Sequence, residues 1–538
     1  MKSRAEHLKR QTRVYIGHTL SNRIMNRPHL SILLASASLA ALTAAASAQT
    51  SATAKIDHPA IGKNLLKLEI HEMDGKPLLG AKVTLSVGMA NMDMGIDHPK
   101  AIDMGHGIYQ TEVRFSMAGP WTVSAKIISA AGTETTKAFS FTVGSEAEMN
   151  SAMAGRLGTW SMSKEGSGTS WLPESSPMFM KMLEPAGRYE LSVMGYITAN
   201  FTSSGGLRGQ QKSFSNSMPM LMATRGTGGG TLGMSLMLSL DPIFNGQYGY
   251  PNLFQTGETA YGTRLEDVQH PHNLVSELTA SYSHPIGSGV SAFLYGGPIG
   301  EPALGGPTFA HRPSGNEIPE APITHHWFDS THISSGVVTL GLNTSHWQLE
   351  GSSFNGHEPG ENRYWPQPIA FNSASGRLTY SPNKNLSFNT SYGVLNQPES
   401  TAPGQDQRRF TGSAILSLPM PHGDNFSTTA YFGEKTELGV KSDAYTLEAT
   451  YLHGPDSIFA RWENVNETEL PDVPAGSYRV NKVLFGDVHN FAAKGGLELG
   501  LGGYIGLYSF PSELVPFYGN HPVTLGVFLR LRPSRMDR

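Results

Sequence analysis

The segment that best indicates the fold is VTLGVFLRLR at residues 523–532, in which valine or leucine occupies every second position. Alternation with a period of two is typical of a β-strand with one apolar and one mostly polar face. The same pattern recurs in LSFNTSYGV at 386–394 and in YTLEATY at 445–451. Such segments, about ten residues long, follow one another from 188 to 535, and we therefore predict an antiparallel transmembrane β-barrel there.

We count about sixteen candidate barrel strands, and an even number is usual in bacterial barrels. They are expected to start near Tyr189, Lys212, Thr231, Asn273, Ser288, Val337, Trp347, Ala374, Leu386, Phe410, Phe426, Ala444, Ile458, Tyr478, Leu497 and Val523. The connections at 245–272 and 300–334 are long. Long connections in such barrels face outward or fold into the pore.

Composition agrees with an exported barrel. The 538 residues include 60 Gly and 34 Pro, and only 16% are charged. The net charge of −4 argues against a nucleic-acid partner. The chain has no cysteine, which excludes disulfides, thiolate metal sites and a cysteine nucleophile.

The amino terminus predicts export. A short apolar run at 30–42 follows basic residues and precedes Ala46-Ser47-Ala48, the pattern of a secretory signal peptide with its cleavage site. We assign 1–48 to this signal and hypothesise that synthesis starts at Met25. Together with the barrel, the signal predicts a Gram-negative outer membrane, with lipid around the barrel and the amino-terminal domain in the periplasm.

Residues 50–145 predict an Ig-like β-sandwich of five to seven short strands. A methionine-rich loop, then Gly107-Ile108-Tyr109, then FSMAGPWTV at 115–123, resembles the YtkA-like (FixH-related) periplasmic domain. The resemblance implies proximity to metal-handling membrane proteins and copper contact. Residues 146–187 are expected to be a linker, and its apolar part before the first barrel strand is a candidate plug.

The long-loop region resembles a second family, of uncharacterised outer-membrane proteins associated with heavy-metal resistance. The resemblance covers most of 168–365 and rests on motifs such as Gly249-Tyr250-Pro251, Gln269-His270-Pro271-His272, His325-His326-Trp327 and Phe354-Asn355-Gly356. It implies a role in metal resistance but no particular reaction.

Methionine and histidine supply the candidate metal ligands. Thioether sulfur selects Cu(I), and imidazole suits copper, zinc and nickel. The sandwich candidates are Met89, Met92, Met94, His98, Met104 and His106, and the barrel candidates are His270, His272, His325, His326 and His332. The alternatives are methionines that fill a small core and histidines that stiffen a hydrogen-bonded plug. The trios Met178, Met180, Met182 and Met218, Met220, Met222 fit packing or lipid contact, or else a metal relay.

These observations leave three functional hypotheses. The first is a non-enzymatic barrel that handles copper or another soft metal ion, together with periplasmic efflux components. The second is a general porin or small-solute channel in which the sandwich is structural. The third is a barrel esterase using Ser330 with His332, or Ser345 with His346, although no nucleophile motif surrounds either pair.

Overall fold

The computed structural model describes residues 50–90, 96–116, 118–144 and 154–536. The expected signal peptide, Met92 and Met94 lie outside these residues. The fold is all-β, as predicted, with only short helices. No helix in the described ranges has the length and hydropathy needed to cross a membrane.

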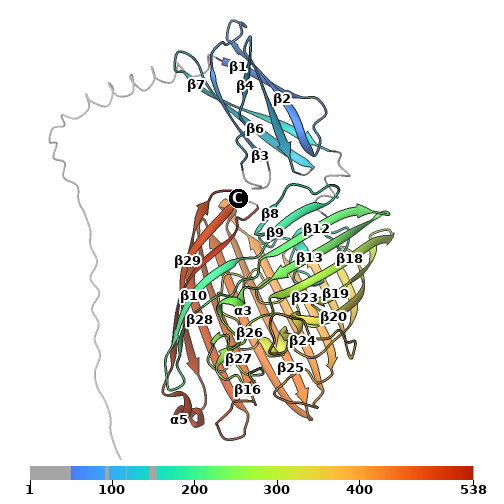
Figure 1. The fold of residues 1–538 in the computed structure, drawn as a ribbon, viewed down its shortest axis with the longest axis vertical. Helices are drawn as coiled ribbons and strands as arrows, with labels where there is room; N and C mark the ends of the chain where they lie inside the picture. Colours follow the sequence, from blue (N-terminus) through green and yellow to red (C-terminus); the bar gives the residue numbers. More distant parts are fainter. Residues whose placement is uncertain (1–49, 91–95, 117, 145–153, 537–538) are drawn as a thin grey trace, which may run out of the picture.

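The amino-terminal unit is a sandwich of two antiparallel sheets (Figure 1). One sheet has the order β1-β2-β5-β4 and the other β3-β6-β7. Alternate residues of facing strands, such as Leu68, Val113 and Val123, are fully buried between the sheets. The strand bounds are β1 (Thr50–Ile56), β2 (Gly62–Glu72), β3 (Lys82–Met89), β4 (Ile102–Gly105), β5 (Ile108–Phe115), β6 (Gly119–Ile128) and β7 (Glu134–Val143).

The second unit is a closed barrel whose first two strands are each interrupted. β9 (Glu190–Met194) and β10 (Ile197–Ser204) pair with β12 (Met220–Thr227) and β11 (Gln211–Phe214) in one continuous register. β10 also pairs with β30 (Val523–Pro533), with Ala199 opposite Leu529, and this pairing closes the ring. When each interrupted strand is counted once, the described residues form sixteen barrel strands, and the predicted number is confirmed.

The other barrel strands pair with their neighbours in chain order. They are β13 (Gly230–Leu238), β18 (Val275–Gly287), β19 (Val290–Gly300), β20 (Ser334–Asn343), β21 (Trp347–Phe354), β22 (Ser373–Asn383), β23 (Leu386–Leu395), β24 (Gln407–Pro419), β25 (Asn425–Glu437), β26 (Val440–His453), β27 (Asp456–Glu467), β28 (Tyr478–Ala493) and β29 (Leu497–Ser509). The short β8 (Met180–Met182) pairs with β9 beyond the end of β30.

The alternation seen in the sequence separates the two faces of the wall. On β30, Leu525, Val527 and Leu529 are exposed on the outside, whereas Arg530 and Arg532 are buried inside. An apolar exterior and a polar interior are the pattern of a barrel surrounded by lipid. The fold thus directs the charged side chains of the wall into the lumen.

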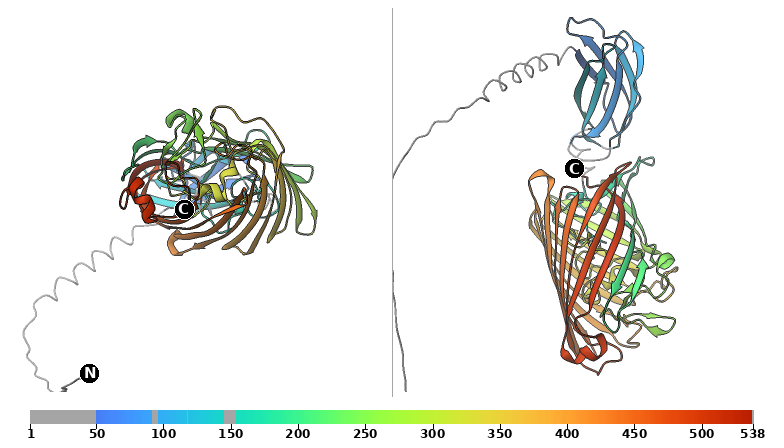
Figure 2. Two further views of the ribbon diagram at one scale, coloured as in Figure 1. Left: turned by 90° about the horizontal axis from the view of Figure 1, so that it is seen from below. Right: turned by 90° about the vertical axis from the view of Figure 1, so that its left-hand side faces the viewer.

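The two ends of the barrel differ. One end has only short turns, such as Gly228-Gly229, whose positive φ angles suit the tight turn between β12 and β13. The sandwich and the carboxyl terminus lie at this end (Figures 1 and 2). The long connections and α5 (Val515–Tyr518) lie at the opposite end.

Three segments fold into the lumen. The connection 301–333 is almost entirely buried and contains α4 (His325–Phe328) and η2 (Ser330–His332), which is seen inside the ring of strands in Figure 2. The connection 239–274 enters the lumen only in part, because His270 and His272 are buried whereas Phe244 and Tyr261 are exposed. It contains α3 (Asp241–Phe244) and four two-residue strands, namely β14 (Tyr250–Pro251), β15 (Thr259–Ala260), β16 (Thr263–Arg264) and β17 (Val268–Gln269). Residues 154–182, with η1 (Met162–Lys164), also contact the inner wall, since the Asn343 side chain donates to the Leu157 carbonyl. Two further short helices, η3 (Pro421–Gly423) and η4 (Ser512–Leu514), lie in connections.

Candidate functional site: the histidine cluster in the lumen

Buried ion pairs connect the 301–333 segment, which we call the plug, to the wall. Arg312 donates to Glu448 on β26 over 2.5 Å, and Glu448 also accepts from Arg461 on β27 over 3.0 Å. Glu317 of the plug pairs with Arg530 and Arg532 at 2.7 and 2.6 Å. Removing one partner of such a buried pair is costly because a charge is left without compensation. The plug is therefore held by specific charge pairs.

The structure brings together all five histidines that the sequence analysis singled out in the barrel. Ring centroids are 5.2 Å apart for His325 and His332, 5.3 Å for His272 and His332, and 5.5 Å for His325 and His326. His270 lies 6.1 Å from His325 and 5.8 Å from His326. The cluster joins two connections that are about 50 residues apart in sequence, and every ring in it is buried.

Each ring in the core of this cluster is held through Nδ1. His272 Nδ1 lies 2.8 Å from Asp241 Oδ2, and His325 Nδ1 lies 2.6 Å from Asp329 Oδ1. His332 Nδ1 lies 2.7 Å from the Asp329 carbonyl oxygen. The Nε2 atoms of these three rings are buried and have no hydrogen-bond partner among the residues that the structure describes. An imidazole anchored at one nitrogen by a carboxylate or carbonyl, with the other nitrogen free, has the orientation of a metal ligand.

Burial keeps part of the cluster neutral. It lowers the pKa of His332 and of His270 well below the usual value, and neighbouring histidines add to the shift for His332. His326 differs: burial disfavours its charged form, but Glu358, 3.5 Å away, and Glu399 together outweigh burial and raise the pKa to about 9. At neutral pH the cluster thus combines neutral rings with one imidazolium paired to a carboxylate.

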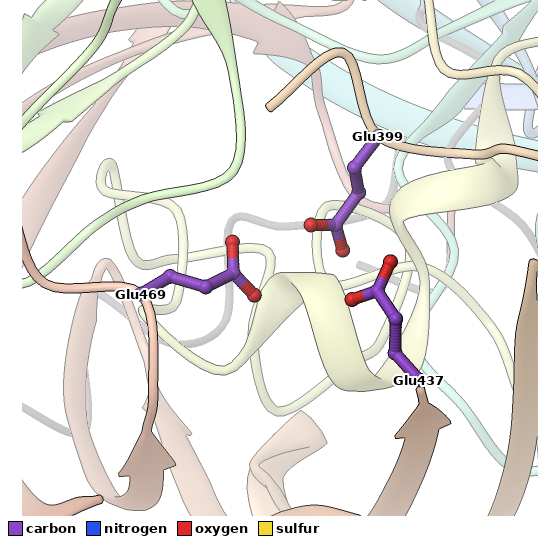
Figure 3. A group of neighbouring side chains, drawn as sticks. All are labelled: Glu399, Glu437 and Glu469. Atoms are coloured by element: carbon purple, nitrogen blue, oxygen red, sulfur yellow. The ribbon is translucent and has the colours of Figure 1, made fainter. Parts of the chain in front are cut away.

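A second group of ionisable side chains lies beside the cluster, near the end with long connections. Carboxylate oxygens of Glu399, Glu437 and Glu469 lie within 4.8 Å of one another and point toward a common centre (Figure 3). Among the described residues, the oxygens of this trio lie close enough together to hold one metal ion, whereas the histidine nitrogens of the cluster are spaced more widely. Lys435 compensates the trio, at 3.1 Å from Glu399 and 2.6 Å from Glu469. Two of the three carboxylates are therefore already paired with an internal ammonium group.

The sandwich candidates are not gathered in the same way. Met89 is at the far end of β3, paired with Trp121, while His106 follows β4 near the start of β5. His106 lies near the start of β3, since the nearby Tyr109 donates to the Ala81 carbonyl, whereas Met89 is the last residue of β3. The length of β3 therefore separates Met89 from His106 by roughly 20 Å. Met104 and His98 are exposed, and His98 Nδ1 contacts the Leu85 carbonyl oxygen at 3.2 Å. The described members of this set thus form no common site.

The two serine–histidine pairs are engaged elsewhere. Ser330 is buried in the lumen and accepts from Arg409 over 2.8 Å, while His332 Nδ1 contacts the Asp329 carbonyl oxygen. His346 Nδ1 contacts the Ser381 carbonyl oxygen at 2.8 Å. Neither arrangement provides the serine–imidazole hydrogen bond on which nucleophilic catalysis depends.

Sequence reasoning missed several residues of the lumen. Asp241, which anchors His272, is about 30 residues away in sequence and belongs to an ordinary Asp-Pro helix start. The arginines that hold the plug, such as Arg461 and Arg377, occupy polar positions of alternating strands and look like solvated lumen residues. The alternation placed them inside, but their plug partners depend on how the long connections fold.

Comparisons with known proteins identify one region of the chain. Residues 46–126 match the YtkA-like family. This YtkA-like region covers most of the sandwich, in agreement with the resemblance drawn from its motifs. No curated protein matches the chain.

Among solved structures, the chain is similar to outer-membrane porins. An anion-selective porin from Comamonas acidovorans has 11% identity and a TM-score of 0.40, with 64% of this chain and 99% of the porin covered. OprB from Pseudomonas putida has 10% identity and a TM-score of 0.39, with 63% and 94% covered. OmpF from Salmonella typhi, in complex with daunomycin, has 9% identity and a TM-score of 0.39, with 64% and 98% covered.

Proposed function

We propose that the protein is an outer-membrane channel for small solutes or ions whose resting lumen is closed by the plug. Closed barrels are the β-structures that satisfy every backbone group in lipid, and the ring of sixteen strands with its apolar exterior fits that environment. Short turns face the periplasm in such barrels. The sandwich at the short-turn end is therefore assigned to the periplasm.

The observation that carries this proposal is how the plug is attached. Within the part of the chain that the structure describes, residues 301–333 share no strand pairing with the wall. Side chains hold them, with Arg312 on Glu448 and Glu317 on Arg530 and Arg532. Side-chain contacts break without opening the barrel, whereas loss of strand pairing exposes backbone groups to lipid. In this proposal the plug can therefore leave the lumen while the strand pairing of the wall stays intact.

Conductance in planar bilayers tests the channel. The purified protein is compared with a variant in which 302–332 are replaced by a short Gly-Ser turn. We expect small or rare conductance steps from the intact protein and large, stable steps from the variant. Folding of both is checked by heat-modifiable gel migration. A folded variant that conducts no better than the intact protein contradicts the proposal.

A second candidate function, metal handling, is favoured by the three unpaired Nε2 atoms of His272, His325 and His332. Zinc titration of the full protein by calorimetry tests it, with a triple His→Gln variant at these positions. The matched control is His453→Gln with His489→Gln, because both rings are exposed but have the same Nδ1–carboxylate contact, at 2.7 and 2.6 Å. Equal zinc binding by all three proteins contradicts this function.

A further inference from the structure

A methionine row crosses four neighbouring strands on the inner wall of the barrel. Met194 on β9 lies directly opposite Met180 on β8 and Met220 on β12, and Met220 lies opposite Met237 on β13. Four adjacent strands thus each place a methionine at the same level. Directly opposed residues have Cβ atoms about 5 Å apart, so neighbouring thioether sulfurs are within reach of one another.

This row is unusual for its position. The lumen face of a transmembrane barrel is ordinarily polar, and further along the same strands it is, with Ser192, Asn200 and Ser235 pointing inward. On β13 the alternation places Met234 on the outside, 40% exposed, and Met237 inside, 4% exposed. Simple lipid contact therefore explains Met234 but not the inward-facing row.

The row borders a cavity. Met180, Met194 and Met220 line a space of ≈ 100 Å³, and four more methionines line it as well: Met162, Met178, Met218 and Met222. Drug-sized ligands occupy pockets of roughly 300–1,000 Å³, so this space suits an ion or a few water molecules. If these methionines served only for packing, their flexible side chains would be expected to fill such a gap. The cavity nevertheless stays open although seven methionines line it.

The charged groups at the cavity do not exclude a cation. Arg156 lies 3.5 Å from Glu165, which also lines the cavity. Arg532 is paired with Glu317 at 2.6 Å and with Glu498 at 2.6 Å. His311 lines the cavity too, and burial with nearby Arg156 lowers its pKa to about 4. Its ring is thus neutral at neutral pH and offers a nitrogen beside the sulfurs.

We propose that this methionine chamber binds a soft monovalent cation, Cu(I) or Ag(I), through the thioethers of Met180, Met194 and Met220. Thioether sulfur prefers such ions over zinc, calcium or magnesium. The strands β8 and β9, which carry Met180 and Met194, lie at the end of the barrel that carries the sandwich (Figure 1). The chamber is separate from the histidine cluster, whose nitrogen ligands suit divalent ions.

Silver binding to the full protein in detergent tests the chamber, since Ag(I) does not change oxidation state in air. Titrations in chloride-free nitrate buffer compare the wild type with Met180→Leu/Met194→Leu/Met220→Leu, a change that nearly conserves volume. The control is Met73→Leu/Met234→Leu/Met420→Leu, at three exposed methionines. We expect the chamber variant to lose at least one bound Ag(I) per chain and the control to lose none. Equal stoichiometry and affinity in a folded chamber variant overturn the proposal.

A second measurement needs no variant. X-ray absorption at the silver edge of the wild type, loaded with one equivalent, is expected to show sulfur neighbours. Silver coordinated only by nitrogen or oxygen overturns the proposal even if the triple variant fails to fold. Bilayer conductance measured without silver tests the channel function separately. Silver binding can be absent from a protein that conducts, and a protein that does not conduct can still bind silver.

Discussion

Glu448→Gln is the sharpest test of how the lumen is closed. The Glu448 carboxylate accepts from Arg312 on the plug at 2.5 Å, from Arg461 on the wall at 3.0 Å and from Ser314 on the plug at 3.0 Å. The side chains of Glu448, Arg312 and Arg461 are each at most 1% exposed. The substitution keeps the shape but places a neutral amide between two buried guanidiniums, of which Arg312 keeps its pairing with Asp329 at 3.2 Å.

The expected cost of breaking this arrangement is about 3–5 kcal/mol. If all of it favours the undocked plug, the docking equilibrium changes by roughly 10²- to 10⁴-fold. Other plug contacts remain, including those of Glu317 with Arg530 and Arg532. We therefore expect the open probability in planar bilayers to rise at least about tenfold, with the same step size as the plug-deleted protein.

Glu434→Gln is the matched control. Glu434 pairs with Lys441 at 2.7 Å, but this pair is solvent-exposed and is worth about 0–1 kcal/mol. Its open probability is expected to equal that of the wild type. If Glu448→Gln folds, as judged by heat-modifiable migration, and its open probability also stays at the wild-type level, then charge pairing does not hold the plug.

Three further predictions concern stability. Because the pKa of His326 is raised, its contribution to the free energy of unfolding is complete below about pH 6.5 and is lost as pH rises through about 9. The melting temperature of the wild type should therefore fall between pH 7 and pH 10, and that of His326→Gln should fall less. Parallel pH profiles of the melting temperature for the two proteins refute this. Leu529→Arg places a charge on the lipid-facing side of β30 and should destabilise the barrel in lipid by about 2–4 kcal/mol, measured by urea titration, whereas Leu529→Ile should have little effect. Gly249→Ala should destabilise the protein by at least about 1–2 kcal/mol, because Gly249 has a φ of 68° and an added Cβ would lie 1.7 Å from the Gln269 carbonyl oxygen. The control is Gly246→Ala, because the exposed Gly246 has a similar φ of 66° but open space around an added Cβ. The difference between the two variants separates the steric clash from the backbone strain.

The barrel wall was the most predictable part of this protein. The strands β23, β28, β29 and β30 begin at the predicted Leu386, Tyr478, Leu497 and Val523. The prediction works because alternation is a local property that also states which face of each strand is outside. The predicted starts at Tyr189 and Lys212 lie one residue from the starts of β9 and β11. The interruptions of these two strands were not predicted, and only the register shows that β10 and β12 continue them.

The candidate sites show where local information ends. The sequence by itself determined an all-β chain, a YtkA-like sandwich, a wall of sixteen strands and an unusual supply of histidine and methionine. Whether those ligands meet was decided by the tertiary structure. His272 and His332 meet because two long connections fold into the same lumen, and Met180, Met194 and Met220 meet because the register of β8, β9 and β12 aligns them. Met89 and His106, only 17 residues apart in sequence, are kept apart by the length of an extended strand.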